Sequence, residues 1–96
     1  MKYAYLWYVK VSQEALKKMI SDNKYAPNWV AKVKEIVKKA GVKLLFIGTP
    51  YGTVEQYVVA IESDNPLDEH SKVNSEFYRI DPAFIEYAKT EIIALS

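Results

Sequence analysis

The segment from Gly41 to Glu62 constrains the fold most, because it holds two apolar runs on either side of a turn. Residues 42–47 and 54–61 are rich in β-branched and aromatic residues, and glycine and proline punctuate residues 48–52 between them. This pattern predicts a β-hairpin. A strand with one face in water alternates between apolar and polar residues, yet both predicted strands are apolar on both faces. We therefore expect both sides of the sheet to be covered.

Strict alternation assigns the residues of each strand to two faces. In the first strand of the hairpin, it places Leu44 and Phe46 on one face, and Leu45 and Ile47 on the other. In the second strand, Val58 and Ala60 oppose Tyr57, Val59 and Ile61. The N-terminal segment repeats this two-sided pattern, with Tyr3, Tyr5, Trp7, Val9 and Val11 on one face and Ala4, Leu6 and Tyr8 on the other.

Apolar residues at helical spacing predict a first helical region that begins after Ser12 as an N-cap and ends at Gly41. The pattern breaks between residues 21 and 27, where Pro27 suits a first helical turn. The lysines on the polar side of the second part are expected to be solvated; they are Lys32, Lys34, Lys38 and Lys39.

A second helix is predicted from Pro66 to about Ile80, with capping side chains supplied by residues 63–65. Asp81 and Pro82 then predict one or two further helical turns through Phe84 and Tyr87. The last strand is predicted from Lys89 to Leu95.

The predicted order of elements is β, α, β, β, α, β over residues 1–96, which is the order of a ferredoxin-like α+β domain. Two helices cover only one face of a four-stranded antiparallel sheet. Because the second face is also apolar, we expect a homodimer that packs sheet on sheet, or a higher oligomer.

Composition and charge narrow the class of protein. The chain has no cysteine and no apolar run long enough to span a membrane, so we expect a cytoplasmic protein without membrane contact. Twelve of the thirteen basic residues are lysines, a usage compatible with a thermophile. Residues 1–48 carry a net charge of +7 and residues 49–96 carry −6. Two interpretations are solvated helix faces of opposite sign and contact between oppositely charged regions of neighbouring subunits. The small overall charge disfavours the third, a nucleic-acid-binding surface.

The element order, the two-sided strands and the segments GVKLLFIGTPYGTVEQYVVAIE and NPLDEHSKVNSEF resemble the dimeric α/β-barrel superfamily over nearly the whole chain. They are similar in particular to small uncharacterised archaeal and bacterial members. The resemblance implies a homodimer whose two sheets form a barrel. It implies no single activity, because the superfamily includes cofactor-independent monooxygenases, muconolactone isomerase, haem-binding enzymes and ligand-sensing domains.

His70 is the candidate catalytic residue, because it is the chain's one histidine and titrates near neutral pH. Packing in the core and binding of haem are the alternatives for it. Tyr5, Trp7 and Tyr57 are the candidate ligand-binding residues, since they supply aromatic surface and hydroxyl groups. One histidine and no cysteine do not provide the ligands of a structural zinc or a non-haem iron triad, and we predict neither a metal nor a cofactor.

Two functions follow from these residues. The first is a non-catalytic dimeric barrel that binds a small apolar or aromatic molecule or serves as an assembly unit. The second is a cofactor-independent monooxygenase or isomerase that uses His70 as acid or base. The turn at residues 48–52 joins two strands, which disfavours phosphate binding, and its Tyr51 is expected to contact a neighbouring subunit.

Overall fold

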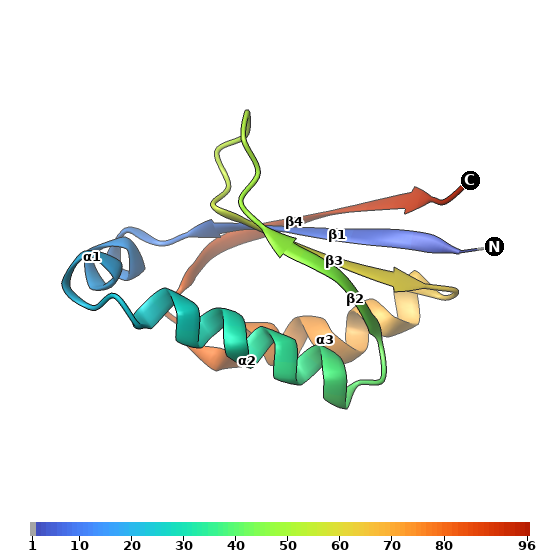
Figure 1. Cartoon of the computed structure of the whole chain (residues 1–96), viewed down its shortest axis with the longest axis horizontal. Coiled ribbons are helices and arrows are strands. Elements are labelled where there is room, and N and C mark those ends of the chain that lie inside the picture. Colours follow the sequence, from blue (N-terminus) through green and yellow to red (C-terminus); the bar gives the residue numbers. More distant parts are fainter. Residues whose placement is uncertain (1) are drawn as a thin grey trace.

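The computed structural model describes residues 2–96, except for the side chains of Pro66 and His70. Its elements in chain order are β1 (Tyr3–Val11), α1 (Gln13–Ser21), α2 (Tyr25–Lys39), β2 (Lys43–Gly48), β3 (Tyr57–Ser63), α3 (Pro66–Ile80) and β4 (Ile85–Ala94). The strands form one antiparallel sheet in the order β2-β3-β1-β4. Helices α2 and α3 pack on one face of this sheet (Figure 1). The predicted ferredoxin-like α+β fold is therefore confirmed.

The predicted break in the first helical region is also confirmed, and it separates α1 from α2. Residue Asp22 is extended, and its carboxylate accepts a hydrogen bond of 2.9 Å from the backbone N–H of Lys24. Ser12 caps α1 as predicted, accepting a hydrogen bond of 3.0 Å from the Ala15 N–H and donating one to the Ala83 carbonyl. Helix α1 lies beyond the end of β1, at the left in Figure 1. No helix in the described part of the chain has the length and apolarity needed to cross a lipid bilayer.

Two predicted boundaries are wrong. Strand β3 begins at Tyr57 instead of Val54, which lengthens the β2–β3 loop to residues 49–56. The segment 85–87 is the start of β4 instead of a helical turn, because Ile85 pairs with Val11 in the sheet. The Asp81 side chain does form the predicted turn, accepting a hydrogen bond of 3.0 Å from the Ala83 N–H. Pairing of a β-branched residue with β1 outweighs this local helix signal.

The predicted faces of β2 are also wrong in part, because the register shifts between Leu44 and Phe46. Leu44 pairs with Ile61 and Ile47 pairs with Val59, so both lie on the face that the helices cover. Phe46 pairs with Ala60 and lies on the opposite face. A β-bulge of this kind adds one residue to a strand and reverses the alternation after it.

The N-terminus of α3 differs from the prediction as well. Asn65 occupies the N-cap position, but its side chain makes no capping hydrogen bond to any residue that the structure describes. Ser63 instead accepts a hydrogen bond of 2.9 Å from the Asn65 backbone N–H. The start of α3 is favoured by the acidic residues Asp68 and Glu69 in its first turn, which complement the helix dipole.

The core lies between the sheet and the helices. The Trp29 and Phe84 rings stack at its centre, with centroids 4.3 Å apart and planes 8° apart. The ring of Trp7 in β1 contacts the ring of Phe77 in α3, with centroids 4.6 Å apart. Other buried residues of this core are Tyr5, Val9, Val11, Val33, Val37, Val59, Ile61 and Val73. They include the predicted Trp29 stripe of α2 and one of the two predicted faces of β1, the face that carries Tyr5 and Trp7. The periodicity does not predict which face of β1 meets the helices.

Candidate functional site

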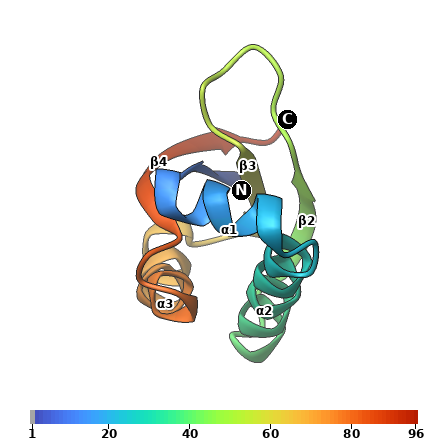
Figure 2. The ribbon, with the colours of Figure 1, turned by 90° about the vertical axis from the view of Figure 1, so that its left-hand side faces the viewer.

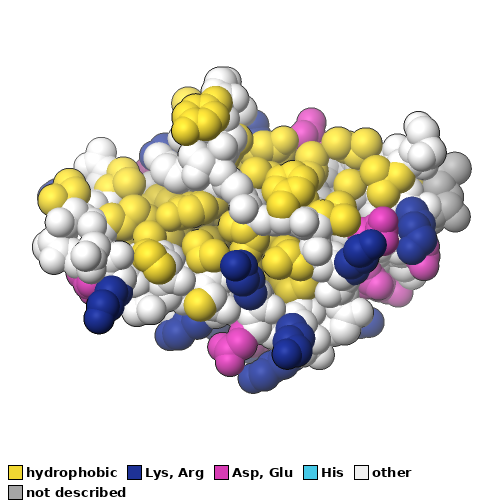
Figure 3. Space-filling model, viewed as in Figure 1, with side chains coloured by type: hydrophobic (Ala, Val, Ile, Leu, Met, Phe, Trp, Pro, Cys, Tyr) yellow, Lys and Arg dark blue, Asp and Glu magenta, His cyan; other side chains and the backbone are white. Residues whose placement is uncertain are grey.

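The face of the sheet away from the helices, which we call the outer face, is apolar at its centre. Its central residues Ala4, Val58 and Ala60 are buried, with exposed fractions of 7%, 8% and 0%. Towards the edge strands, Phe46 and Ile93 are 50% and 45% exposed. Hydrophobic side chains gather in a band over the strands, and Lys and Arg side chains lie mainly below it over the helices (Figure 3). Large apolar side chains thus remain in water on a side of the sheet that no helix within residues 2–96 covers.

The outer face is charged at its two ends. At one end, the Glu62 carboxylate lies 3.4 Å from Lys2 Nζ and 3.6 Å from Lys43 Nζ. At the other end, Lys10 Nζ lies 4.0 Å from the Glu86 carboxylate. Each of these ion pairs has at least one largely solvated partner, so solvent screens it and it contributes little to stability.

The β2–β3 loop, residues 49–56, rises on the side of the sheet opposite the helices (Figures 1 and 2). Gly52 has φ +89°, a left-handed conformation that glycine adopts without strain. Two apolar side chains of the loop are in solvent, since Tyr51 is 94% exposed and Val54 is 67% exposed. The loop therefore places apolar surface beyond the outer face.

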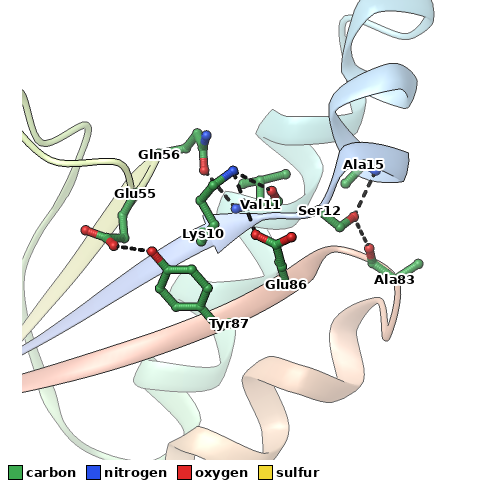
Figure 4. A network of polar contacts seen from close by, with 9 residues as sticks. All are labelled: Lys10, Val11, Ser12, Ala15, Glu55, Gln56, Ala83, Glu86 and Tyr87. Carbon is green, nitrogen blue, oxygen red and sulfur yellow. Dashed lines mark hydrogen bonds and ion pairs between the residues drawn. The ribbon is translucent and has the colours of Figure 1, made fainter.

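The base of this loop is held by polar contacts (Figure 4). Glu55 is 4% exposed, and its carboxylate accepts a hydrogen bond of 2.6 Å from the Tyr87 hydroxyl. Lys89 Nζ lies 3.6 Å from the same carboxylate. The Gln56 backbone N–H donates to the Val9 carbonyl at 3.0 Å, and its side-chain oxygen accepts from the Val11 N–H at 2.8 Å. These contacts fix the direction in which the loop leaves the sheet.

The contacts of Glu55 shift the acid–base properties of both partners. The hydrogen bond from Tyr87 lowers the pKa of Glu55, and the charge of Lys89 lowers it further. The same hydrogen bond raises the pKa of Tyr87. The residue pattern does not predict this cluster, because it places Glu55 within a strand and Tyr87 in a helical turn. A lone glutamate before an apolar strand carries no signal that it will be buried.

The predicted ligand-binding residues lie in or beside the core. Tyr5 and Trp7 are each 2% exposed, and the Tyr5 hydroxyl hydrogen-bonds Thr90 Oγ1 at 2.9 Å. Tyr57 is half-buried, and its ring centroid lies 5.5 Å from that of Trp29. Burial raises the pKa of the Tyr57 hydroxyl. The structure therefore gathers the three on the helical face of the sheet, and binding of a ligand there stays a prediction.

The predicted catalytic residue, His70, belongs to α3, but its side chain lies outside the described residues. Its role as acid, base or haem ligand stays a prediction.

A second polar cluster lies where α2 begins and α3 ends. The Tyr25 hydroxyl donates a hydrogen bond to the Asp81 carboxylate. Burial and this hydrogen bond raise the pKa of Tyr25 to about 12, and the hydrogen bond lowers the pKa of Asp81. Both residues line a hollow of about 280 Å³ together with Trp29, whose buried Nε1 has no hydrogen-bond partner among the described residues. The pair ties the first turn of α2 to the segment that leads into β4.

No family model matches the chain, and no curated protein matches it. Among solved structures, an uncharacterised NIPSNAP-like domain protein from Burkholderia xenovorans is similar, with a TM-score of 0.66 and 10% identity. The match covers 99% of this chain and 85% of that protein. A protein from Agrobacterium tumefaciens is similar with a TM-score of 0.55 and 17% identity, over 100% and 94% of the two chains. At these identities, the comparisons show that the chain shares the ferredoxin-like fold of these proteins.

Proposed function

We propose that the protein is a homodimeric assembly unit in which the outer faces of two copies pack sheet on sheet. The observation that carries this proposal is the apolar outer face, on which Phe46 and Ile93 keep about half of their surface in water. Exposed apolar patches of this kind mark interaction surfaces in soluble proteins. A second copy is the simplest partner, because a twofold axis makes the same patch serve on both sides.

The size of the outer face supports a dimer when the loop is included. Strands of six to ten residues at about 3.3 Å per residue are about 20–33 Å long, and four strands about 4.8 Å apart are about 19 Å wide. Their projected area is about 500 Å² per copy. A standard interface buries about 800 Å² per partner. Contacts of the second copy with the β2–β3 loop, and Tyr51 in particular, supply the remaining area.

Separation of like charges favours one arrangement of the two copies. One end of the outer face carries one carboxylate and two lysines, which are Glu62, Lys2 and Lys43. The other end carries two lysines and two carboxylates, which are Lys10, Lys89, Glu55 and Glu86. Glu91 lies between the two ends, because it pairs with Leu6 in the middle of the sheet. A twofold axis that lies in the interface and runs across the strands brings each end over the opposite end of the partner. Each net positive end then meets an end without net charge, and the two positive ends stay apart, which favours this orientation.

A charged substitution on the outer face tests the proposal. Ile93→Glu places a carboxylate where the partner sheet must pack, whereas the 45% exposure of Ile93 lets the single chain tolerate the change. Leu67→Glu is the matched control, because Leu67 is 73% exposed on α3. Light scattering during size-exclusion chromatography should give a dimer for the wild type and the control, and a monomer for Ile93→Glu. A dimer that survives Ile93→Glu unchanged would contradict the proposal.

Two finer functions remain predictions beside this proposal. Binding of a small apolar or aromatic molecule would use Tyr5, Trp7 and Tyr57, and a monooxygenase or isomerase activity would use His70. Titration with haem tests one branch, because a Soret band that disappears in His70→Ala would assign His70 as the axial ligand. If no Soret band appears, haem binding through His70 is excluded.

A further inference from the structure

Helices α2 and α3 border a groove made of hollows that share walls. Hollows of about 230 and 280 Å³ share Lys32 and Ile80. The first of these shares Ile36, Lys39 and Glu76 with another hollow of about 330 Å³. We call the two adjoining hollows of about 230 and 330 Å³ the α2–α3 groove. The helices lie on the opposite side of the sheet from the outer face, so the groove stays open in the proposed dimer (Figure 2).

The groove has an apolar floor and basic walls. Ile36, Ala40 and Ile80 are half-buried and form the apolar part. Four cationic and two anionic side chains line the groove; they are Lys32, Lys39, Lys72, Arg79, Glu35 and Glu76. The groove therefore carries an excess of positive charge.

The excess is not neutralised by neighbouring side chains. Arg79 pairs with Glu76 at 2.8 Å. Lys32, Lys39 and Lys72 form no ion pair with any residue that the structure describes. Lys39 of α2 and Lys72 of α3 line the same hollow from opposite helices, and like charges held on facing walls repel each other. An anion between them would replace this repulsion with attraction.

We propose that the α2–α3 groove binds a small organic anion with an apolar body, of the alkyl or aryl carboxylate class. The carboxylate lies between Lys39 and Lys72, and the apolar body follows Ile36 and Ile80 towards Lys32. Residues 32 and 39 are seven positions apart on α2, so this path is about 10 Å long. A volume of about 330 Å³ in the Lys39 hollow is within the range of small-molecule sites. This site is independent of the proposed dimerisation and of the predicted residues Tyr5, Trp7 and Tyr57.

Calorimetric titration of the full chain with octanoate tests the proposal, with octanol as the uncharged probe of equal length. The double substitution Lys39→Ala/Lys72→Ala removes the two facing charges. Its control, Lys34→Ala/Lys38→Ala, removes two exposed lysines of α2 that line neither part of the groove. All four lysines are solvated, so circular dichroism should show that both variants fold.

We expect octanoate to bind once per chain, more tightly than octanol. The Lys39/Lys72 variant should raise the Kd for octanoate about tenfold, as loss of two partly screened ion pairs implies, and the control should change it less than about twofold. The proposal is overturned if octanoate does not bind, if octanol binds equally well, or if both double variants weaken binding to the same extent. The mass of the protein in solution bears on none of these outcomes.

Discussion

Replacement of Phe46 by alanine should dissociate the proposed dimer while leaving the single chain folded. Phe46 is 50% exposed, and a phenylalanine presents on the order of 200 Å² of surface, so about 100 Å² remains for a partner to cover. At about 25 cal/mol per Å², this area is worth about 2.5 kcal/mol per copy and about 5 kcal/mol per symmetric dimer. Only part of this burial free energy appears in the free energy of association, and we expect about half of it. The Kd of the dimer should then rise about 50- to 100-fold.

Sedimentation equilibrium over a range of concentrations measures this change. Ile20→Ala is the matched control, because Ile20 is 89% exposed on α1, away from the outer face. Thermal unfolding in dilute solution separates dissociation from loss of folding, since a half-exposed phenylalanine contributes only about 1–2 kcal/mol to the single chain. A Kd for Phe46→Ala that stays within about twofold of the wild type would refute the reasoning, as would an equal rise in Ile20→Ala.

Three further predictions concern the polar clusters and the core. The hydrogen bond from Tyr87 lowers the pKa of Glu55, so the ionised carboxylate should stabilise the fold above the ordinary carboxyl pKa of 4.5 and lose this effect as the pH falls through the lowered pKa of the folded state. The difference in urea midpoint between wild type and Glu55→Gln should therefore narrow from about pH 7 to about pH 3. A difference that stays constant over this range would contradict the prediction. Tyr25 has a pKa raised to about 12 by burial and by its hydrogen bond to Asp81, so its contribution should hold below pH 10 and fall as the pH approaches 12; ultraviolet titration of Tyr25→Phe should show one tyrosinate fewer near pH 12, in a late part of the titration to which Tyr57 and Tyr87 also contribute, and an unchanged absorbance change near pH 12 would contradict this. Phe84 is completely buried, and Phe84→Ala should cost about 3–5 kcal/mol in chemical denaturation, whereas a loss below about 1 kcal/mol would show that the core packs differently.

Much of the fold follows from sequence periodicity, because long periodic segments leave few alternatives. β1, α2 and α3 lie close to where their apolar spacing places them. The errors occur where pairing between distant strands decides the structure. The bulge between Leu44 and Phe46 depends on the register with β3, and the start of β4 at Ile85 depends on pairing with β1. Neither register is encoded in the local pattern.

The candidate sites were harder to predict than the fold. Residue spacing predicts that Lys32 and Lys39 are solvated, and both are exposed. It does not show that Lys72, on a helix 33 residues later in the chain, lines the same groove as Lys39. The burial of Glu55 beside Tyr87 likewise depends on the path of the β2–β3 loop. In each case, the residues of a candidate site come together through tertiary packing, which periodicity does not describe.

The mass of the wild-type protein in solution tests the central proposal most directly. Sedimentation equilibrium at micromolar concentration should give twice the chain mass of 11.0 kDa, because the apolar outer face is expected to be covered by a second copy. A single species of 11.0 kDa under the same conditions would contradict the proposal that two outer faces pack together.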